Sequence, residues 1–284
     1  MTTLRQRLSG SELIVAPGVF DLISARIADR MGFDALYMTG YGTVASYLGL
    51  PDAGLATYTD MVERVGRIAG GTKTPLIADA DTGYGGLLNV QHTVRGYEAA
   101  GAAAIQLEDQ EFPKKCGHLP GRRVILAEDM ARKIRVAVES RDSKEMLIIA
   151  RTDARTSLGL DEALRRAEAY RKAGADILFV ESPETVEEMA IIGRTFDAPL
   201  LANMVEGGRT PVLDRKTLLE LGYRIAIFPA LGFLASGAAL DTAYSALREN
   251  GSTRGTRQPL YPFEAFAKLM GFDAVAEFDA KHSD

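Results

Sequence analysis

The chain has 284 residues, 46% of them hydrophobic, so it is long enough to bury a large core in one or two domains. Its formal net charge of −5, with basic residues interleaved among acidic ones, argues against a nucleic-acid partner, which needs clustered lysine and arginine. The single cysteine excludes an intrachain disulfide. With no signal-peptide pattern and no apolar stretch long enough to span a bilayer, the sequence predicts a cytoplasmic protein.

Eight apolar runs are predicted to be strands, with helical segments between them. A helix that ends at glycine and leads into a strand recurs in phrases such as "RMGFDALYMTG", "AAGAAAIQLED" and "KAGADILFVES". Eight such units predict a (β/α)8 barrel. A doubly wound open sheet is the alternative, but no glycine-rich dinucleotide fingerprint follows the first strand. In chain order the predicted strands cover residues 13–18, 35–40, 75–83, 104–110, 147–154, 177–182, 199–208 and 224–230.

The end of the chain differs in composition from the repeating part. The eighth unit ends near Gly251, which predicts a barrel domain over residues 1–251. Residues 252–284 begin as a Ser/Thr/Arg/Gly linker and then become helical with aromatic side chains. An extension with this much apolar surface is expected to cover its own barrel or a neighbouring subunit.

Acidic residues gather at the predicted carboxyl ends of two neighbouring strands. "ADADTGYG" places Asp79 and Asp81 two residues apart on one face, and "QLEDQ" contributes Glu108 and Asp109 from the next strand. Carboxylates that converge at one mouth repel each other unless a cation neutralises them. The oxygen-only set favours Mg²⁺ or Mn²⁺, and the scattered histidines argue against zinc. Helix capping or solvated turns would be the alternative explanation.

The only cysteine, Cys116, lies in the loop "PKKCGHLPG" directly after the acidic fourth strand. Lys114, Lys115 and His118 would favour its thiolate form. A single cysteine is usually a small buried hydrophobe, but this loop is polar and contains glycine. The sequence therefore favours a reactive Cys116 above the same end of the barrel.

Further polar residues end the later strands. Arg151 follows "IIA", Glu181 follows "FV", and Asn203 and Glu206 lie in "LANMVEGG". Each could form an ion pair or hydrogen bond that joins neighbouring strands. Because all of them lie at the carboxyl ends of strands, however, a substrate-binding role is favoured. Arg151 suits a substrate carboxylate, because its fork pairs with two oxygens at once.

These motifs together resemble a known family. The motifs that carry the resemblance are, in chain order, "YMTGYG", "GLPDAG", "ADADTGYG", "LEDQ", "KKCGH", "ARTDA" and "LANMVEGGRTP". The chain resembles the isocitrate lyase/phosphoenolpyruvate mutase superfamily over about residues 10–250. The resemblance implies a Mg²⁺-dependent barrel, with Mn²⁺ as an alternative, that cleaves or forms C–C or P–C bonds beside an α-keto or α-hydroxy carboxylate. "KKCGH" implies the lyase branch, because the P–C mutases lack this loop.

Two positions suggest the substrate within that branch. Val205 stands in "NMVEGG" where 2-methylisocitrate lyases carry a threonine, which favours a smaller dicarboxylate and resembles the 2,3-dimethylmalate lyases. Pro229 in "IFPA" stands about where the related oxaloacetate hydrolases carry a serine, which favours lyase over hydrolase. The expected reaction is retro-Claisen cleavage of a substituted malate to pyruvate and a carboxylic acid. The alternatives are 2-methylisocitrate lyase, then oxaloacetate hydrolase or decarboxylase, then phosphonate mutase.

The resemblance also implies roles for individual residues. Tyr37 would be the base for the C2 hydroxyl and Cys116 the acid that protonates the departing carbanion. Asp79, Asp81 and Glu108 would hold the metal. The catalytic set is expected to comprise Cys116, Tyr37, Asp52, His118 and Lys115. The substrate is expected to contact Thr39, Gly40, Tyr41, Gly117, Arg151, Glu181, Asn203 and Glu206.

The resemblance further implies the assembly. Members of the family exchange the last barrel helix between subunits, so a homotetramer built as a dimer of dimers is expected. The partner of the site is a small dicarboxylate, and neither nucleic acid nor a membrane is expected to bind.

Overall fold

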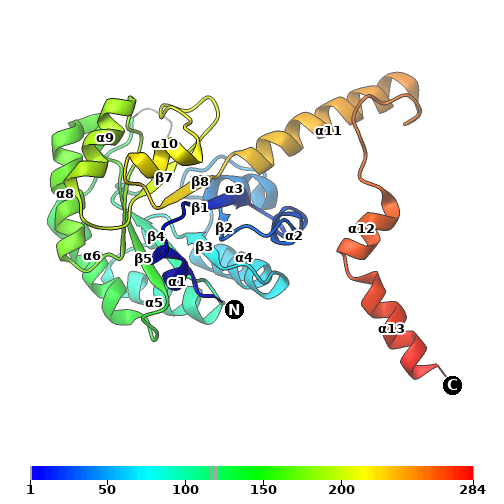
Figure 1. Ribbon diagram of the computed structural model, residues 1–284, viewed down its shortest axis with the longest axis horizontal. Helices are drawn as coiled ribbons and strands as arrows, with labels where there is room; N and C mark the ends of the chain where they lie inside the picture. The colour runs from blue at the N-terminus through cyan, green and yellow to red at the C-terminus, as the bar shows by residue number, and fades with distance from the viewer. Residues whose placement is uncertain (1, 116, 118–120, 284) are drawn as a thin grey trace. The chain divides into compact units, whose positions relative to one another are not determined.

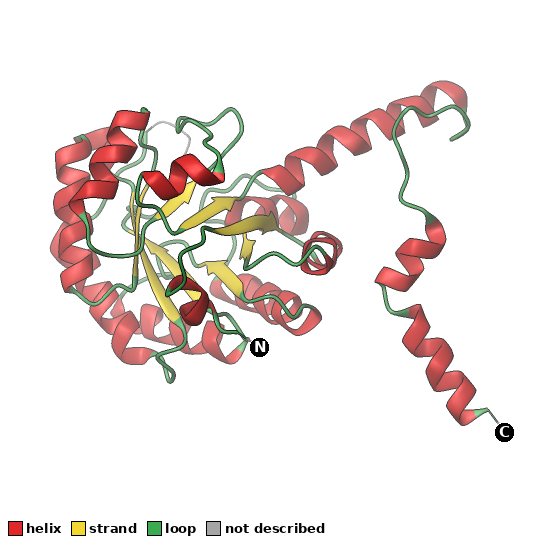
Figure 2. Ribbon diagram, in the orientation of Figure 1, coloured by secondary structure: helices red, strands yellow, loops and turns green. Residues whose placement is uncertain are grey.

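The computed structural model describes residues 2–115, 117 and 121–283 and contains one sheet of eight parallel strands. The strands follow one another around the sheet in the order β6-β5-β4-β3-β2-β1-β8-β7, and a parallel bridge between Leu178 and Leu200 joins its two ends. Helices lie outside the strands (Figures 1 and 2). The predicted (β/α)8 barrel is therefore confirmed. The strands are β1 (Ile14–Val19), β2 (Leu36–Met38), β3 (Leu76–Asp79), β4 (Ala104–Glu108), β5 (Leu147–Thr152), β6 (Ile177–Val180), β7 (Leu201–Asn203) and β8 (Ile225–Phe228).

All eight strands fall within or beside the predicted ranges, but several are shorter. The third was predicted to reach residue 83 and ends at Asp79, because Asp81 and Tyr84 adopt positive φ angles of 49° and 57°. A left-handed backbone cannot continue an extended strand. The strand therefore turns away immediately after the first of its two aspartates.

Within the described residues, ten helices accompany the strands up to β8. Short polar side chains cap several of them; Asp21 accepts a hydrogen bond from the amide of Ser24, and Thr57 from that of Asp60. The helices are α1 (Leu4–Leu8), α2 (Leu22–Arg30), α3 (Gly40–Leu48), α4 (Tyr58–Gly71), α5 (Leu87–Ala99), α6 (Ala127–Ser140), α7 (Ala154–Leu158), α8 (Leu160–Lys172), α9 (Val186–Thr195) and α10 (Arg215–Glu220).

The inside of the barrel is layered along the strand direction. Alternate strand residues such as Ile14, Ile77 and Phe179 form one apolar cluster, and Leu4 of α1 belongs to it. The same inward-facing positions become polar at the carboxyl ends of the strands, because side chains two residues apart share a face. This alternation places Asp79, Gln106, Glu108, Arg151, Glu181 and Asn203 toward one mouth.

The outward faces of the strands pack against the helices in two further clusters. One contains Met38, Ile105 and Ile148, and the other contains Leu178, Ala202 and Ala226. Both faces of the sheet are thus buried, as expected for parallel strands. The residues at the mouth are therefore held by strands that are packed on both faces.

The chain divides into two compact units, Met1–Phe233 and Leu234–Asp284. The helix after β8, α11 (Leu231–Asn250), runs across this division, so the predicted boundary after residue 251 stays a prediction. The second unit also contains α12 (Phe263–Leu269) and α13 (Phe272–His282) and carries exposed apolar side chains such as Tyr244, Phe263 and Phe278. In the part of the chain that is described, no helix is both long and apolar enough to cross a membrane.

Candidate active site

A cavity of about 510 Å³ opens at the carboxyl ends of the strands. Its lining contains eleven of the residues predicted from the sequence, from loops and strands far apart in the chain. The lining residues are Tyr37, Thr39, Tyr41, Asp52, Asp79, Glu108, Lys114, Lys115, Gly117, Arg151, Glu181, Asn203, Val205, Ile227, Pro229, Ala230 and Phe233.

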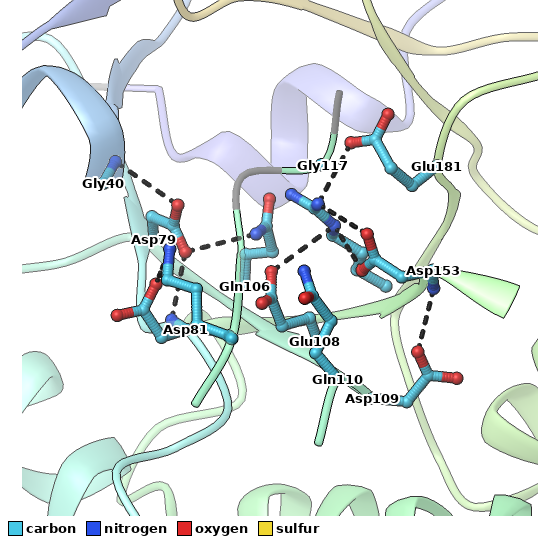
Figure 3. Close-up of polar contacts among 12 residues, drawn as sticks. Gly40, Asp79, Asp81, Gln106, Glu108, Asp109, Gln110, Gly117, Asp153 and Glu181 are labelled. Atoms are coloured by element: carbon cyan, nitrogen blue, oxygen red, sulfur yellow. Dashed lines mark hydrogen bonds and ion pairs between the residues drawn. The ribbon is translucent and has the colours of Figure 1, made fainter. Parts of the chain in front are cut away.

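Asp79, at the end of β3, is held by three hydrogen bonds. Its carboxylate accepts from the backbone amides of Gly40 at 3.3 Å and Asp81 at 3.0 Å, and from Nε2 of Gln106 at 3.3 Å (Figure 3). A Cβ on Gly40 would lie 2.6 Å from Oδ2 of Asp79, so only glycine permits this approach. Asp79 is therefore fixed in orientation before anything binds.

Lys114 lies among the carboxylates. Its ammonium forms ion pairs with Asp52 and, at 2.6 Å, with Asp81, and all three side chains are buried. Burial alone would lower the pKa of Lys114, but Asp81 and Asp52 raise it well above its ordinary value. Lys114 therefore stays protonated and neutralises part of the acidic cluster.

The remaining acidic oxygens suit a divalent cation. Burial, followed by the charge of Asp81, raises the pKa of Asp79, and burial raises the pKa of Glu108 well above its usual range. Oε1 of Glu108 is buried and has no hydrogen-bond partner among the described residues. A nearby cation would favour the charged forms of these carboxylates, and Mg²⁺ prefers such oxygen ligands.

No three Asp, Glu, His or Cys side chains in the described ranges are placed to hold one ion together. A cation here would therefore take few oxygens directly from the protein. Mg²⁺ commonly keeps several of its waters and is bound through one or two carboxylates, so this arrangement fits it.

Arg151, on β5, is buried beside Glu108 of the neighbouring strand β4. Its Nε and Nη2 donate to the two carboxylate oxygens of Asp153 at 2.9 and 2.8 Å, and Nη2 lies 3.3 Å from Oε2 of Glu181. Its Nε also lies 3.5 Å from Oε2 of Glu108. The guanidinium is thus held in one plane and still lines the cavity, where it can meet a carboxylate.

Tyr37, on β2, faces the same cluster. Its hydroxyl donates to Oε1 of Gln106 at 2.8 Å, and burial followed by the charge of Asp79 raises its pKa well above 10. The phenol is therefore protonated in this arrangement. The predicted role of Tyr37 as a base stays a prediction and requires a compensating positive charge nearby.

The loop after β4 is tied down at several places. The side-chain amide of Gln110 donates to the carbonyl of Lys115 at 2.8 Å, and its Oε1 accepts from the amide of Lys115 at 2.9 Å. Oγ of Ser182 donates to the carbonyl of Gly117 at 3.1 Å. A Cβ on Gly117 would lie 2.3 Å from Nη2 of Arg151, so this glycine lets the loop backbone reach the floor of the cavity.

One wall of the cavity is apolar. The rings of Tyr41 and Phe233 lie 5.1 Å apart between centroids, and Val205, Ile227 and Pro229 continue the wall. The cavity therefore combines a charged half with a half that would accept an alkyl group.

Some predicted residues lie elsewhere. Asp109 was expected at the mouth but points outward, because it follows Glu108 by one position and adjacent strand residues face opposite sides (Figure 3). Glu206 is exposed and lies outside the cavity lining, so its substrate contact stays a prediction. Cys116 and His118 lie outside the described residues, and their predicted roles stay predictions.

Other residues of the site were missed from the sequence. Gln106 lies two positions before Glu108 inside a buried strand, and this spacing could have identified it as facing the mouth. Gln110 and Asp153 also hold backbone or side chains at the site, and each follows a predicted site residue by two positions, so the same spacing could have identified them. The position of Arg122 carries no comparable signal.

Comparison with known proteins gives the family. Residues 4–248 match the phosphoenolpyruvate phosphomutase family. The chain is 48% identical over 280 residues to 2,3-dimethylmalate lyase of Eubacterium barkeri, covering 99% of this chain and 97% of the relative. It is 44% identical over 280 residues to a 2-methylisocitrate lyase of Aeropyrum pernix, covering 99% and 90% of the two chains.

Solved structures agree with this result. A crystal structure of 2,3-dimethylmalate lyase superposes with a TM-score of 0.92 at 38% identity, covering 98% of this chain and 93% of the other. The structure of oxaloacetate acetylhydrolase bound to 3,3-difluorooxalacetate superposes with a TM-score of 0.93 at 39% identity, covering 98% of this chain and 95% of the other. The structure of phosphonopyruvate hydrolase bound to oxalate and Mg²⁺ superposes with a TM-score of 0.89 at 29% identity, covering 99% of this chain and 98% of the other. The chain belongs to the PEP mutase/isocitrate lyase superfamily.

The buried lysine gives a first test. Replacing Lys114 with methionine leaves Asp52 and Asp81 buried without their ion-pair partner. Because breaking a buried pair typically costs about 3–5 kcal/mol, the variant is expected to lose about 3 kcal/mol of unfolding free energy in EDTA, measured by urea denaturation. The exposed neighbour Lys115 provides the control, and Lys115→Met is expected to change the value by less than about 0.5 kcal/mol. Equal stability of the two variants would contradict the assignment.

Proposed function

We propose that this chain is a Mg²⁺-dependent carbon–carbon lyase that cleaves a 2,3-dialkylmalate to a 2-keto acid, which is pyruvate when the C2 substituent is methyl, and a carboxylic acid. The observation that carries the proposal is one cavity that is lined by oxygen-only acidic groups, a buried arginine and apolar side chains. The acidic groups suit a cation beside the C2 oxygen, the arginine suits a carboxylate, and the wall suits alkyl substituents. The relative of Eubacterium barkeri is named for this substrate class.

Bound Mg²⁺ would take one or two ligands directly from the carboxylates of Asp79, Asp81 and Glu108, and would reach the others and the nearby Asp52 through water. It would stabilise negative charge on the substrate oxygens. The chain's own residues supply the rest. Arg151 orients a substrate carboxylate, because Asp153 fixes its guanidinium in the cavity. The other contacts are proposed for Thr39, Gly40, Tyr41, Gly117, Glu181, Asn203 and Glu206.

The reaction needs one base and one acid. Bound Mg²⁺ would supply the positive charge that favours the ionised form of the Tyr37 phenol. As a phenolate, Tyr37 takes the proton of the C2 hydroxyl, the C2–oxygen bond becomes a carbonyl, and the C2–C3 bond breaks with its electron pair on C3. Cys116 then donates its thiol proton to C3, with Lys115 and His118 beside it in the chain. The products are a 2-keto acid and a carboxylic acid, so atoms and charge balance.

The apolar wall favours a substituted dicarboxylate over its close alternatives. Val205 lines the cavity and offers no hydroxyl to a third carboxylate, which disfavours 2-methylisocitrate. Pro229 lines it as well and offers no donor to a hydrated keto group, which disfavours hydrolysis of oxaloacetate. 2-Methylisocitrate lyase remains the second candidate, because the relative of Aeropyrum pernix bears that name.

A substrate screen tests the proposal directly. Alkylated malates, 2-methylisocitrate, oxaloacetate and a phosphonate are each incubated with the chain and Mg²⁺, and release of 2-keto acid is followed. The 2,3-dialkylmalate is expected to give the highest kcat/KM, and EDTA is expected to abolish turnover reversibly. Faster turnover of 2-methylisocitrate or oxaloacetate would contradict the proposed substrate, and turnover that survives EDTA would contradict the metal.

Replacement of Cys116 by serine tests the acid. Because serine is a far weaker acid than cysteine, the variant is expected to lose about 10²–10⁴-fold in kcat. Binding of the dicarboxylate, measured by calorimetry with Mg²⁺, serves as the control and is expected to stay within about threefold. Retention of most of the turnover would rule out the acid role.

We also propose a homotetramer, built as a dimer of dimers, in which α11 is exchanged between subunits. The exposed apolar side chains of residues 234–284 support this, because a partner subunit would bury them. Light scattering of the purified chain is expected to give four times the mass of one chain. A monomeric mass would contradict the proposal.

A further inference from the structure

Asp153, directly after β5, is fully buried and lies outside the cavity lining. Both of its carboxylate oxygens are used by Arg151, in a parallel pair of hydrogen bonds. Burial alone would raise the pKa of Asp153, but Arg151 and Arg122 hold it below its usual value. Asp153 is therefore a buried anion whose partners are two arginines.

The second arginine comes from the other side of the loop. Nη1 of Arg122 donates to Oδ1 of Asp153 at 2.5 Å, and Oδ1 is the same oxygen that Nη2 of Arg151 contacts at 2.8 Å. Nη2 of Arg122 donates to Oγ1 of Thr156 at 2.5 Å. Arg122 stands where the loop returns to the barrel, next to the bridge between Gln110 and Val124. One carboxylate oxygen thus joins the returning end of the loop to the arginine of the cavity.

Asp153 is itself held from behind by a second buried carboxylate. The backbone amide of Asp153 donates to Oδ1 of Asp109 at 2.8 Å (Figure 3). The other oxygen of Asp109 accepts from Oγ1 of Thr152 and from the hydroxyl of Tyr170, both at 2.7 Å. Arg166 of α8 lies 3.2 Å from the same oxygen. These contacts fix the backbone of Asp153 against the helix layer, so its carboxylate points toward Arg151 and Arg122.

We infer that Asp153 is a positioning residue that orients Arg151 for a substrate carboxylate, and that Arg122 acts on Arg151 through Asp153. The inference rests on the proposed function, because it takes Arg151 as the carboxylate-binding group. Arg151 also lies near Glu181 and Glu108, at 3.3 and 3.5 Å. Without the paired contact to Asp153, the guanidinium would turn toward those carboxylates and leave the plane that faces the cavity. Binding of a planar carboxylate depends on that plane.

The test measures carboxylate binding. Oxalate is the probe, because the structurally similar phosphonopyruvate hydrolase binds it with Mg²⁺. Calorimetry in Mg²⁺ is expected to give a Kd about 100-fold higher for Asp153→Asn, since misplacement of a bidentate clamp costs about this much. Arg122→Met is expected to raise Kd about tenfold, as for an ordinary coupling between sites. Arg122→Lys keeps the positive charge, so its Kd for oxalate is expected to lie between that of Arg122→Met and that of the unaltered chain.

Arg123 provides the matched control. It is the next residue, but its side chain is 76% exposed and pairs with Glu111 on the surface. Arg123→Met is expected to leave oxalate binding unchanged. Mg²⁺ affinity is the readout that separates positioning from general damage to the fold. Because a turned guanidinium also approaches Glu108, the affinity is expected to fall by no more than about tenfold in any variant, whereas an unfolded variant would bind no Mg²⁺.

A double substitution tests whether Arg122 acts through Asp153. Arg122→Met combined with Asp153→Asn is expected to bind oxalate as Asp153→Asn alone does, because the second change removes the path of the first. If the double variant instead shows the product of the two single increases in Kd, the two residues act independently and the inference that Arg122 acts through Asp153 is overturned. Unchanged oxalate binding by Arg122→Met would overturn it too, even if Asp153→Asn fails to fold. If the unaltered chain binds no oxalate, the proposed function falls together with this inference, whereas normal binding by Asp153→Asn overturns the inference alone.

Discussion

The mouth of this barrel depends on the compensation of buried negative charge. Asp52, Asp79, Glu108 and Glu181 line the cavity, and Asp81 and Asp153 are buried just outside its lining. Each carboxylate taken out of water costs several kcal/mol unless a positive group or good hydrogen bonds replace the solvent. Lys114, Arg151 and Arg122 supply the positive charge on the protein side, and a divalent cation suits the acidic oxygens that remain.

Two of those three cations come from the segment that carries the cysteine. Lys114 stands before Cys116 and reaches the acidic cluster, whereas Arg122 stands after it and reaches Asp153. Gly117 between them lies against Arg151 and Glu181. The loop is therefore part of the electrostatic balance of the site, and a change in its anchors alters the charged groups that would meet the substrate.

The cavity also explains how one superfamily can host several reactions. Its acidic half and its arginine suit any small dicarboxylate, because they meet features that all such substrates share. We propose that selectivity lies with the few apolar residues of the lining, among them Val205, Pro229 and Phe233. The relatives named as lyases and a hydrolase share the barrel, and a single donor added to or removed from that wall can change which reaction is favoured.

The sequence by itself determined the barrel and most of the cavity lining. Eight strand and helix alternations are local patterns, and residues at strand ends such as Asp79, Glu108 and Arg151 must converge because parallel strands share one carboxyl edge. Only the tertiary structure decided how their charges are paired. That Asp109 meets Thr152 and Tyr170, that Lys114 lies between Asp52 and Asp81, and that Asp153 joins Arg122 to Arg151 all depend on contacts between residues 31 to 62 positions apart in the chain. Sequence patterns report which face a side chain takes, but the partner it meets there is set by packing.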